Sequence, residues 1–442
     1  MKSKSIAAPS AGGITMPHQS ADAEARLYAK VQWRLIPFLM LCYLGAYLDR
    51  VNVGFAKLQM LNDLKFSETI YGLGAGIFFL GYFLFEVPSN IILHRVGARK
   101  WLARIMLTWA LISASFVFVK TPTSFYVMRF LLGMAEAGFA PGVILYLTYW
   151  FPSVRRAKAL SMFFMAIPLA GIVGGPLSGY IMQAFQGYHD LAGWKWLFML
   201  EALPSLVLGV AILFYLENGI DEAKWLNDQE KALLKHNVAS EGAHKVEHLS
   251  IAAFVQDRRL WLMAAIYFCV VLGQYGLTFW LPTIVKKAGV QDPLWVGVLT
   301  ALPYICTIIA LPLIGMSADR RRERRLHLAV PMILSAAAFL LLPQLSSVSA
   351  SIACLSVAAA GILSASSMFW ALPSAMLGGV SAAAGIAAIN CIANLAGFFS
   401  PAIVGWLNDL TGKSTAGLVF IALVVFFGVA LVFRVPAKTV NR

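Results

Sequence analysis

The chain has 442 residues, of which 60% are hydrophobic and only 13% are charged, and its formal net charge is +14. Soluble domains carry about 25% charged residues, so this composition argues against a soluble enzyme or binding domain. It also gives no reason to expect a nucleic-acid partner, because the Lys and Arg residues gather in the tails and in alternate loops, as in membrane proteins.

Twelve apolar stretches are long enough to cross a bilayer as helices, for which about 20 apolar residues are needed. They cover residues 33–55, 70–92, 101–119, 124–149, 158–183, 196–216, 259–281, 294–317, 327–346, 350–372, 381–407 and 415–434. The sequence therefore predicts an all-α membrane protein with twelve transmembrane helices in two bundles of six. The predicted parts are a tail 1–32, a bundle 33–216, a linker 217–258, a bundle 259–434 and a tail 435–442.

The distribution of basic residues predicts the orientation of the chain in the membrane. An even number of spans puts both termini on one side, and the basic run at 320–325 would lie on that side as well. Because positive residues collect on the cytoplasmic side, we expect cytoplasmic N- and C-termini. The tail 1–32 has no signal-peptide core, so the first span is expected to be an uncleaved anchor. We expect a multi-pass monomer in the inner (plasma) membrane.

Four charged residues interrupt the apolar stretches of the first half. Asp49 and Arg50 lie in the first span, and Arg129 and Glu136 lie in the fourth. A charge at the centre of a bilayer costs about 2.5–3.5 kcal/mol or more, and such residues usually mark a substrate or ion path. A purely structural network of ion pairs is the alternative, and Arg129 is close enough to the span end to reach the interface instead.

Helical spacing suggests how these residues are arranged. Arg129 and Glu136 are seven residues apart and fall on one helix face. Span one is expected to run outward and span four inward, so that Asp49 and Arg129 have compatible depths. Arg50 and Glu136 are then expected on the wall of a central cavity.

The residue types suit a carrier of anions and protons. Arg stays charged, and its planar fork binds a carboxylate through two parallel hydrogen bonds. A substrate carboxylate that competes for the Arg would free the acid to hold a proton. Anion binding and protonation would then be coupled without a covalent step.

An internal repeat relates the two halves at an offset of 225 residues. The offset pairs Gly72 with Gly297, Arg95 with Arg320, and Pro176 with Pro401. Such a parallel repeat is typical of the major facilitator architecture, in which a site lies between the halves near the midplane.

The same offset pairs Asp49 with Gln274, the polar group of an otherwise apolar seventh span. We expect Gln274 and Asn394 to contact substrate, with packing between helices as the alternative. Trp370 is a further candidate that would stack on a ligand, although an aromatic packed in a helix is the commoner case.

The loop after the eighth span resembles a signature of the major facilitator superfamily, Gly-x-x-x-Asp-Arg followed by basic residues. Here it is 315–320, with Asp319 and Arg320, and its first-half copy keeps Arg95 but has His94 in place of the acid. We expect Asp319, Arg320 and Arg95 to form a latch at the cytoplasmic gate, with Glu86 as a further gating or structural residue near a span end.

Four further motifs are similar to those of the anion:cation symporter family, which includes tartrate, phthalate and sugar-acid transporters. They are Tyr47-Leu-Asp-Arg-Val-Asn52, Gly81-Tyr-Phe-Leu-Phe-Glu-Val-Pro-Ser-Asn90, Gly133-Met-Ala-Glu-Ala-Gly138 and Trp194-Lys-Trp-Leu-Phe-Met-Leu-Glu201. The resemblance implies that Asp49 and Glu136 carry protons and that Arg50 contacts the substrate. It also implies that Arg129 tunes the neighbouring acid and that Tyr47 and Tyr82 contact substrate, although interior tyrosines are as often only packed.

We therefore expect proton-coupled uptake of a small organic acid anion by alternating access. Proton-driven efflux of drugs or metabolites on the same fold is the alternative, but it does not call for arginines paired with the acids. The apolar Ile167 replaces a polar residue of sugar-acid members, so a tartrate-like dicarboxylate or an aromatic acid is favoured. No cofactor, metal site or enzymatic activity is expected, because no nucleophile–base arrangement or ligand cluster is visible.

Overall fold

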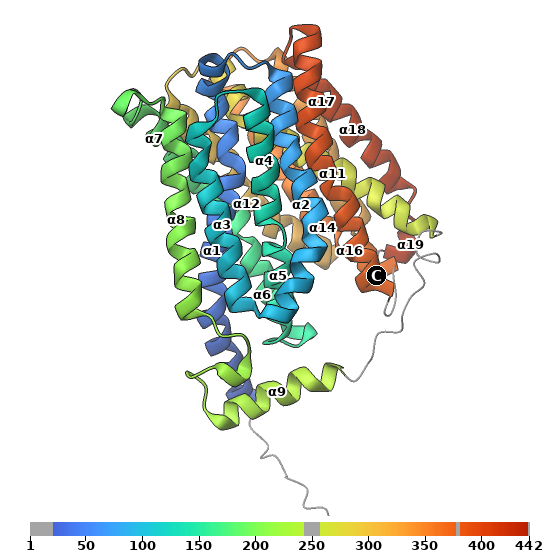
Figure 1. Ribbon diagram of the computed structural model, residues 1–442. Helices are drawn as coiled ribbons and strands as arrows, with labels where there is room; N and C mark the ends of the chain where they lie inside the picture. The colour runs from blue at the N-terminus through green and yellow to red at the C-terminus, as the bar shows by residue number, and fades with distance from the viewer. Residues whose placement is uncertain (1–20, 243–256, 377–380, 441–442) are drawn as a thin grey trace, which may run out of the picture.

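A computed structural model describes residues 21–242, 257–376 and 381–440 of the chain. Parts of the predicted tails and of the predicted linker lie outside the described residues, namely 1–20, 243–256 and 441–442. All regular elements of the described part are helices, and twelve helical spans in it are long and apolar enough to cross a membrane (Figure 1). The prediction of an all-α protein with twelve transmembrane helices is confirmed.

The first bundle contains six of the spans, and the predicted boundary at residue 32 falls inside its first helix. Its helices are α1 (Ala21–Leu64), α2 (Glu68–Val96), α3 (Ala98–Ala114), η1 (Ser115–Phe118), α4 (Pro122–Glu136), α5 (Phe139–Thr148), α6 (Ser153–Phe164), α7 (Ala166–Ala184), η2 (Tyr188–Asp190) and α8 (Gly193–Tyr215). Two short elements follow in the linker, η3 (Ile220–Glu222) and α9 (Asp228–Gly242).

The second bundle contains the other six spans. Its helices are α11 (Arg258–Lys287), α12 (Pro293–Arg321), α13 (Arg325–Leu341), η4 (Leu342–Gln344), α14 (Val348–Phe369), α15 (Ala371–Met376), α16 (Ser381–Asn394), α17 (Ala396–Thr411), α18 (Thr415–Phe433) and α19 (Ala437–Val440).

Short polar loops fix where the helices begin. The Ser67 side chain accepts a hydrogen bond from the backbone N–H of Ile70 and caps α2, and Asp292 caps α12 through Trp295. Pro293 follows at the first helical position, where its missing N–H costs nothing. These caps satisfy backbone donors that would otherwise lack partners at the helix ends.

The two bundles meet along two seams that the internal repeat relates to each other. On one seam a side chain at Gly72 of α2 would collide with the Pro401 carbonyl of α17. On the other, a side chain at Gly297 of α12 would collide with the Gly175 carbonyl of α7. Because small residues let membrane helices approach closely, the glycines paired by the 225-residue offset hold the bundles together at equivalent places.

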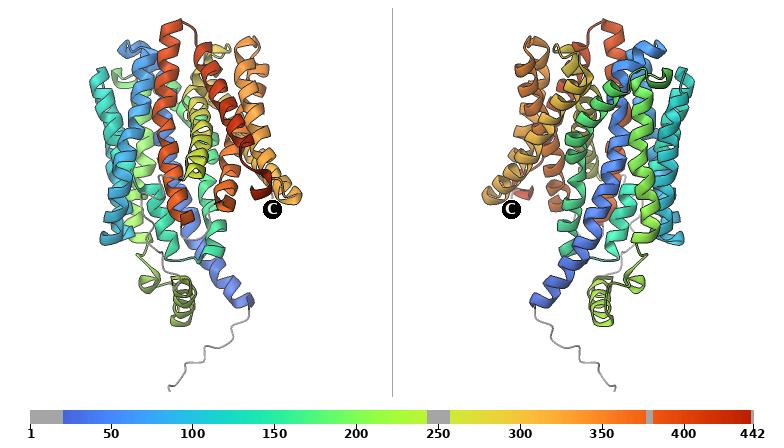
Figure 2. Two further views of the ribbon diagram at one scale, coloured as in Figure 1. Left: turned by 90° about the vertical axis from the view of Figure 1, so that its right-hand side faces the viewer. Right: turned by 90° about the vertical axis from the view of Figure 1, so that its left-hand side faces the viewer.

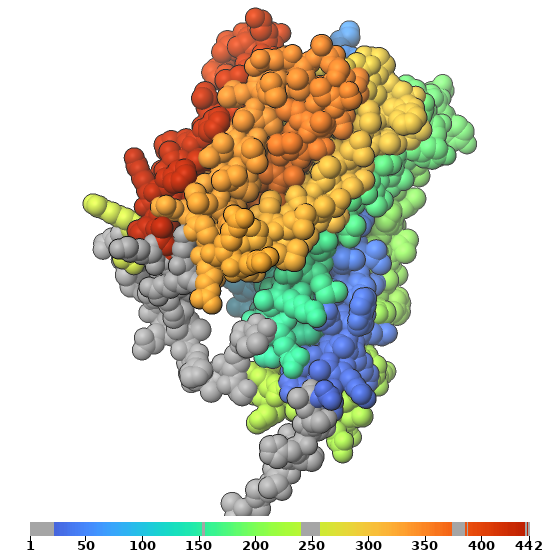
Figure 3. Space-filling view, turned by 180° about the vertical axis from the view of Figure 1, so that it is seen from behind, coloured from blue at the N-terminus to red at the C-terminus, as the bar shows by residue number. Residues whose placement is uncertain are grey.

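These seams lie at one end of the molecule, and the linker lies at the other. Helix α9 is joined to α1 by an ion pair of 2.9 Å between Lys30 Nζ and Glu230 Oε2. Figure 2 shows the second bundle leaning away from the first toward this end, which we call the α9 end. The space-filling view from behind shows the same tilt between the bundles (Figure 3). We call the other end the opposite end.

Four of the spans are interrupted, three of them near the middle and the span of α14 near its end. The breaks separate α4 from α5, α6 from α7, α14 from α15, and α16 from α17. Gly138 at the first break has a φ of 89°, a left-handed value that favours glycine. Interrupted helices in a membrane are tolerated where neighbouring protein or a cavity satisfies the freed backbone groups, and in transporters they often form the substrate site.

Candidate functional site

The centre of the site is an ion pair between two buried side chains. Arg50 of α1 donates from Nη2 to Oε1 of Glu136, the last residue of α4. The exposed fractions of the two residues are only 7% and 2%. Glu136 lies directly before the break at Gly138, so its carboxylate reaches Arg50 from a helix end. Sequence reasoning placed both residues on a cavity wall, and the structure also brings them into direct contact.

Aromatic rings surround the Arg50 guanidinium. Its carbon lies 5.6 Å from the ring centre of Tyr47, 5.3 Å from that of Phe78 and 5.4 Å from that of Tyr82. A cation over an aromatic face gains from the negative ring face, more so where water is excluded. Tyr47 and Tyr82, which the sequence singled out, thus lie next to Arg50, and Phe78 joins them.

The second bundle contributes Tyr275 to the same site. Its hydroxyl accepts a hydrogen bond of 3.5 Å from Arg50 Nη1, across the boundary between the bundles. Sequence reasoning chose the preceding residue, Gln274, and missed Tyr275. The signal was present, because the 225-residue offset pairs Arg50 directly with Tyr275.

Asp49 points away from this centre although it is next to Arg50 in the chain. Its Oδ1 accepts from Ser113 at 2.6 Å, and its Oδ2 accepts from Trp109 Nε1 at 3.1 Å and from Ser205 at 2.9 Å. These donors belong to α3 and α8, inside the first bundle. The carboxylate is fully buried and is held by three neutral donors, with no arginine among them.

Arg129 does not contact Asp49, in spite of their compatible depths. Its guanidinium donates to the backbone carbonyls of Gly74 and Ala75, each at 3.3 Å, and lies 4.9 Å from the ring centre of Phe78. It is fully buried, so it does not reach the interface. Through the shared Phe78 it borders the aromatic group around Arg50, and it lies within electrostatic range of Glu136.

The remaining candidates of the second bundle lie near helix breaks. Trp370 separates α14 from α15, and its ring packs against Tyr267 at 4.7 Å and Phe369 at 5.3 Å between centres. Asn394 is the last residue of α16. The side-chain amides of Asn394 and Gln274 are half-buried and bond to no described residue. Both amides are therefore free to meet a ligand, whereas Trp370 is already packed.

A cavity of about 540 Å³ opens toward the α9 end. It is lined by Glu86, Val87, Asn90, Ile91, His94, Arg95, Pro141, Leu145 and Cys391. Cys391 comes from the second bundle, so the cavity lies between the halves. Its lining begins at Glu86, one helical turn after Tyr82, and therefore reaches close to the aromatic group around Arg50.

The predicted latch residues are apart in this conformation. Arg95, Asp319 and Arg320 are all exposed, and none of them forms an ion pair with a described residue. Arg95 lines the cavity near the α9 end. The open cavity at the α9 end is consistent with the separation of these predicted latch residues.

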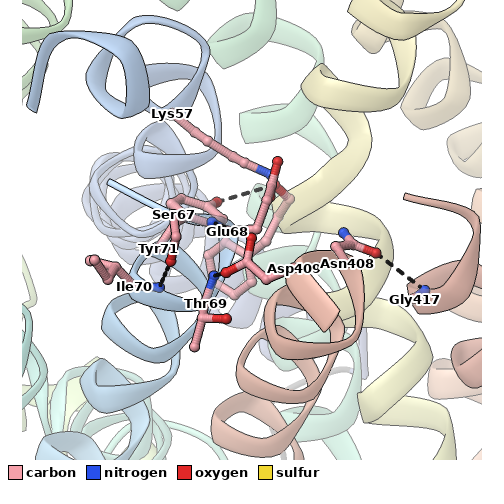
Figure 4. Close-up of polar contacts among 10 residues, drawn as sticks. Lys57, Ser67, Glu68, Thr69, Ile70, Tyr71, Asn408, Asp409 and Gly417 are labelled. Atoms are coloured by element: carbon pink, nitrogen blue, oxygen red, sulfur yellow. Dashed lines mark hydrogen bonds and ion pairs between the residues drawn. The ribbon is translucent and has the colours of Figure 1, made fainter. Parts of the chain in front are cut away.

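The opposite end is closed by a polar cluster that sequence reasoning missed (Figure 4). Asp409 of α17 accepts from the first backbone N–H groups of α2, with Oδ1 at 3.2 Å from the nitrogen of Glu68 and Oδ2 at 2.7 Å from that of Thr69. An acid at a helix N-terminus is stabilised by the helix dipole. A side chain of the second bundle thus caps a helix of the first.

A buried lysine strengthens this closure. Lys57 is 3% exposed, forms an ion pair with Glu68, and lies 4.7 Å from the ring centre of Tyr71 and 4.5 Å from that of Trp280. Trp280 belongs to α11, so the lysine contacts both bundles. In the sequence, Lys57, Glu68 and Asp409 show only as charged residues near the ends of apolar stretches.

No group of His, Cys, Asp and Glu side chains in the described part of the chain has the arrangement of a metal site. The site therefore consists of an arginine, carboxylates, aromatic rings and free amides. Chemically, an arginine can hold an anion and a buried carboxylate can hold a proton.

Comparison with known proteins gives the family. The model of the Major Facilitator Superfamily matches residues 39–401. The chain is 45% identical to the "Putative metabolite transport protein NicT" of Pseudomonas putida over 98% of this chain and 100% of that protein. It is 45% identical to a "Putative tartrate transporter" of Agrobacterium vitis over 91% of this chain and 89% of that protein.

Another relative and a solved structure complete the comparison. The "Quinolone resistance transporter" of Acinetobacter baumannii is 43% identical over 94% of this chain and 96% of that protein. The crystal structure of a bacterial homologue of the human lysosomal transporter Spinster, in an inward-facing and occupied conformation, has a TM-score of 0.72 at 14% identity. It covers 92% of this chain and 96% of that one, and it shows a shared fold.

Proposed function

The chain belongs to the major facilitator superfamily and is a multi-pass membrane transporter, and we propose that it takes up a small organic acid anion together with protons. Membership in the superfamily agrees with the expectation that the chain is not an enzyme. The finer proposal concerns the substrate, the driving ion and the direction of transport.

One observation carries the proposal. The Arg50–Glu136 ion pair is buried between aromatic rings and touches Tyr275 of the other bundle. A buried ion pair is costly to keep, because both charges lose their hydration. Its place at the boundary of two moving bundles gives it a role: an incoming carboxylate replaces Glu136 as the partner of Arg50.

The exchange of partners couples the anion to a proton. Once the substrate carboxylate holds Arg50, the Glu136 carboxylate loses its cation and would remain charged in an apolar place. An unpaired buried charge costs far more than a neutral acid, so Glu136 takes up a proton. When the substrate leaves, Arg50 returns to Glu136 and the proton is released to the same side.

The other candidates have supporting roles. Asp49 is the second proton carrier, inside the first bundle, and Arg129 adjusts the charge balance at Glu136 through space. The substrate contacts Tyr47, Tyr82 and Tyr275 beside Arg50. The free amides of Gln274 and Asn394 bind polar groups of the substrate, and Trp370 borders the site.

Gating follows from the two ends of the molecule. The cluster of Lys57, Glu68 and Asp409 closes the opposite end, and the cavity at the α9 end is the release path past Glu86 and Arg95. When that path closes, Arg95, Asp319 and Arg320 are proposed to come together as a latch. The α9 end is then cytoplasmic, in agreement with its basic loops, and the opposite end faces outward across the inner membrane.

The substrate class is a compact dicarboxylate or an aromatic acid. Aromatic rings dominate the contacts of Arg50, and the half-buried Ile167 at the break between α6 and α7 offers no hydrogen bond to a hydroxyl group. The relative from Agrobacterium vitis is named "Putative tartrate transporter", which supports this choice. Both bundles of one chain complete the site, which supports action as a monomer.

The proposal is tested with the purified protein in liposomes. Labelled tartrate, phthalate, phenylacetate and galactonate are offered with and without an imposed pH gradient, acid outside. We expect accumulation of at least one dicarboxylate or aromatic acid against its gradient, lost when a protonophore is added. If the protonophore leaves accumulation of every acid unchanged, proton coupling is wrong.

Efflux is the second candidate, and one observation favours it. The relative from Acinetobacter baumannii is named a quinolone resistance transporter. If this chain exports such compounds, cells that express it tolerate a higher quinolone concentration than cells with an Arg50→Ala variant. Uptake of an acid without any change in tolerance would exclude efflux as the main activity.

A further inference from the structure

A third buried acid lies in the first bundle, outside the central site. Glu201 of α8 is 1% exposed. Its Oε1 accepts a hydrogen bond of 2.6 Å from the hydroxyl of Ser178 on α7, while its Oε2 is buried and has no partner. No Lys, Arg or His of the described residues forms an ion pair with it.

An unsatisfied amide lies beside the free oxygen. Asn52 of α1 is fully buried, and neither its Oδ1 nor its Nδ2 completes a hydrogen bond, although it lies close to the Glu201 carboxyl. Buried polar groups without partners are rare and costly, at about 1–3 kcal/mol each. Two of them from different helices, next to each other, call for a shared explanation.

A proton on Glu201 provides that explanation. The protonated carboxyl can donate from Oε2 to Asn52 Oδ1, and its other oxygen still accepts from Ser178. A charged carboxylate would instead be buried with at most two neutral donors, Ser178 and the Asn52 amide, and with no cation, which is a more expensive state. The surroundings of Glu201 therefore fit a neutral acid.

The surroundings of Asp49 favour the charged form more than those of Glu201 do. Its two oxygens accept from three donors, and three hydrogen bonds to a carboxylate favour the charged form. Asp49 is near enough to act on Glu201 electrostatically. Ser205 donates to Asp49 and lies one turn from Glu201 on α8, and Asn52 lies one turn from Asp49 on α1. The two acids thus face each other across one seam between α1 and α8.

In the described part of the chain no Lys, Arg or His forms an ion pair with either acid, although Arg50 follows Asp49 in the sequence and Glu136 lies within electrostatic range of Asp49. Helix α7 and η1, which pack on α8, carry no Asp, Glu, Lys, Arg or His. The basic residues of α3 are Arg99, Lys100 and Arg104, in the first two turns from the α9 end. Asp49 is bonded instead by Trp109 and Ser113, which lie farther along the same helix. Because like charges repel, ionisation of one carboxyl makes ionisation of the other less favourable.

The hydrogen bond to Glu201 also connects the acid to the bundle boundary. Ser178 lies between Gly175 and Gly179, whose backbones pack against Gly297 and Pro293 of α12. This is one of the two seams that close the opposite end. When that end opens, α7 and α12 separate, and the donor to Glu201 lies on α7 between the two glycines of this seam.

We propose that Glu201 is a further proton-binding residue, which shares one proton with Asp49 and exchanges it when the seam between α7 and α12 opens. The pair takes up the proton while the seam is open, keeps it on Glu201 once the seam has closed, and passes it to Asp49 for release toward the α9 end. This inference rests on the proposed proton coupling for its role in transport, but the protonation of Glu201 stands on its own geometry.

The first experiment needs no substrate. Infrared spectra of the purified protein in lipid at neutral pH report protonated carboxyls through their C=O stretch, which shifts in heavy water. We expect a band that is absent in Glu201→Gln and present in the control Glu222→Gln, whose acid is exposed in the linker. Ser178→Ala keeps the acid and should shift the band, because its hydrogen bond is lost. An unchanged band in Glu201→Gln overturns the proposal.

The second experiment measures coupling in the liposomes described above. Each coupled proton multiplies accumulation about tenfold for each pH unit of gradient, because one unit corresponds to ~1.4 kcal/mol. We expect Glu201→Gln to lower accumulation about tenfold under a gradient of about one unit and to retain exchange of substrate. A wild-type ratio of protons to substrate in this variant overturns the role in transport. Uncoupled wild-type transport refutes the proposed function, and the infrared result still decides on Glu201.

Discussion

Arg50 and Tyr275 occupy equivalent positions in the two halves of the repeat, and their side chains meet across the boundary between the bundles. The offset of 225 residues pairs them in sequence, and the guanidinium Nη1 lies 3.5 Å from the phenol oxygen. A site at which equivalent residues of two bundles touch is reorganised whenever one bundle rotates against the other. This contact is therefore where a bound substrate would sense the conformation of the transporter.

Replacing Tyr275 by Phe tests the contribution of the second bundle. The ring remains, but the hydroxyl that reaches Arg50 is lost. A hydrogen bond to a charged group is worth about 1.5–3 kcal/mol at good geometry, and at 3.5 Å we expect the lower end, about a tenfold rise in the apparent Michaelis constant. The matched control is Tyr126→Phe on α4, far from Arg50. Equal affinities of both variants would remove Tyr275 from the site.

Replacing Arg50 by Lys keeps the positive charge but removes the planar fork. Because the fork binds a carboxylate through two parallel hydrogen bonds and a lysine does not, we expect affinity to fall at least about tenfold. Transport of each acid is measured over a range of concentrations. Unchanged affinity for every transported acid would mean that Arg50 holds structure and not substrate.

Neutralising the two proposed proton carriers should separate coupling from exchange. Asp49→Asn and Glu136→Gln cannot release a proton, so we expect both to lose uptake driven by a pH gradient. Exchange of labelled for unlabelled substrate needs no net proton movement and should survive better in at least one of them. Full concentrative uptake in both variants would contradict the assignment.

Weakening the closed end should shift the population of conformations. Asp409→Asn removes the negative charge that caps α2, and charged hydrogen bonds of this kind contribute about 1.5–3 kcal/mol. Spin labels are attached to cysteines that replace Lys65 and Lys413 in a background without the native cysteines. We expect the distance between the two labels to lengthen. The control is Asp228→Asn at the start of α9. An unchanged distance distribution would show that Asp409 does not hold this end closed.

Adding a polar group at the break between α6 and α7 should change substrate preference. A sugar acid brings several hydroxyls, and each one left unpaired against an apolar wall costs about 1–3 kcal/mol. We expect Ile167→Gln to raise affinity for galactonate relative to tartrate or phthalate in competition assays. The idea fails if the wild-type protein already binds galactonate more tightly than every dicarboxylate and aromatic acid tested.

The sequence predicted depths in the membrane for the charged residues, but it did not predict the directions in which their side chains point. It placed Asp49 and Arg129 at similar depths, and it predicted a shared cavity wall for Arg50 and Glu136. Consecutive residues of a helix point about 100° apart, since a turn takes 3.6 residues. Asp49 therefore faces α3 and α8 inside the bundle, while Arg50 faces the centre. Helical spacing alone does not say which neighbour each face meets.

The residues whose partners the sequence did not reveal share one property. Each gains its role from a partner on another helix. Tyr275 contacts Arg50, Asp409 caps the start of α2, and Glu201 lies beside Asn52. A tyrosine in an apolar span, or an acid near the end of one, can have a purely structural role when it is considered alone. The partner of Tyr275 is 225 residues away in the chain, those of Asp409 are 340 and 341 residues away, and that of Glu201 is about 150 residues away. Only helix packing brings them together.

By itself the sequence determined the twelve spans, the two halves and the charged residues that must find partners in the membrane. Those features follow from the cost of exposing polar groups to lipid, which acts on every stretch of chain locally. The tertiary structure alone decided that Glu136 and not Asp49 takes an arginine, that Asp49 is held by neutral donors, and which end of the molecule is closed. These features depend on how the helices rotate and pack against one another. Many contacts of nearly equal energy decide that packing, and no local sequence pattern predicts it.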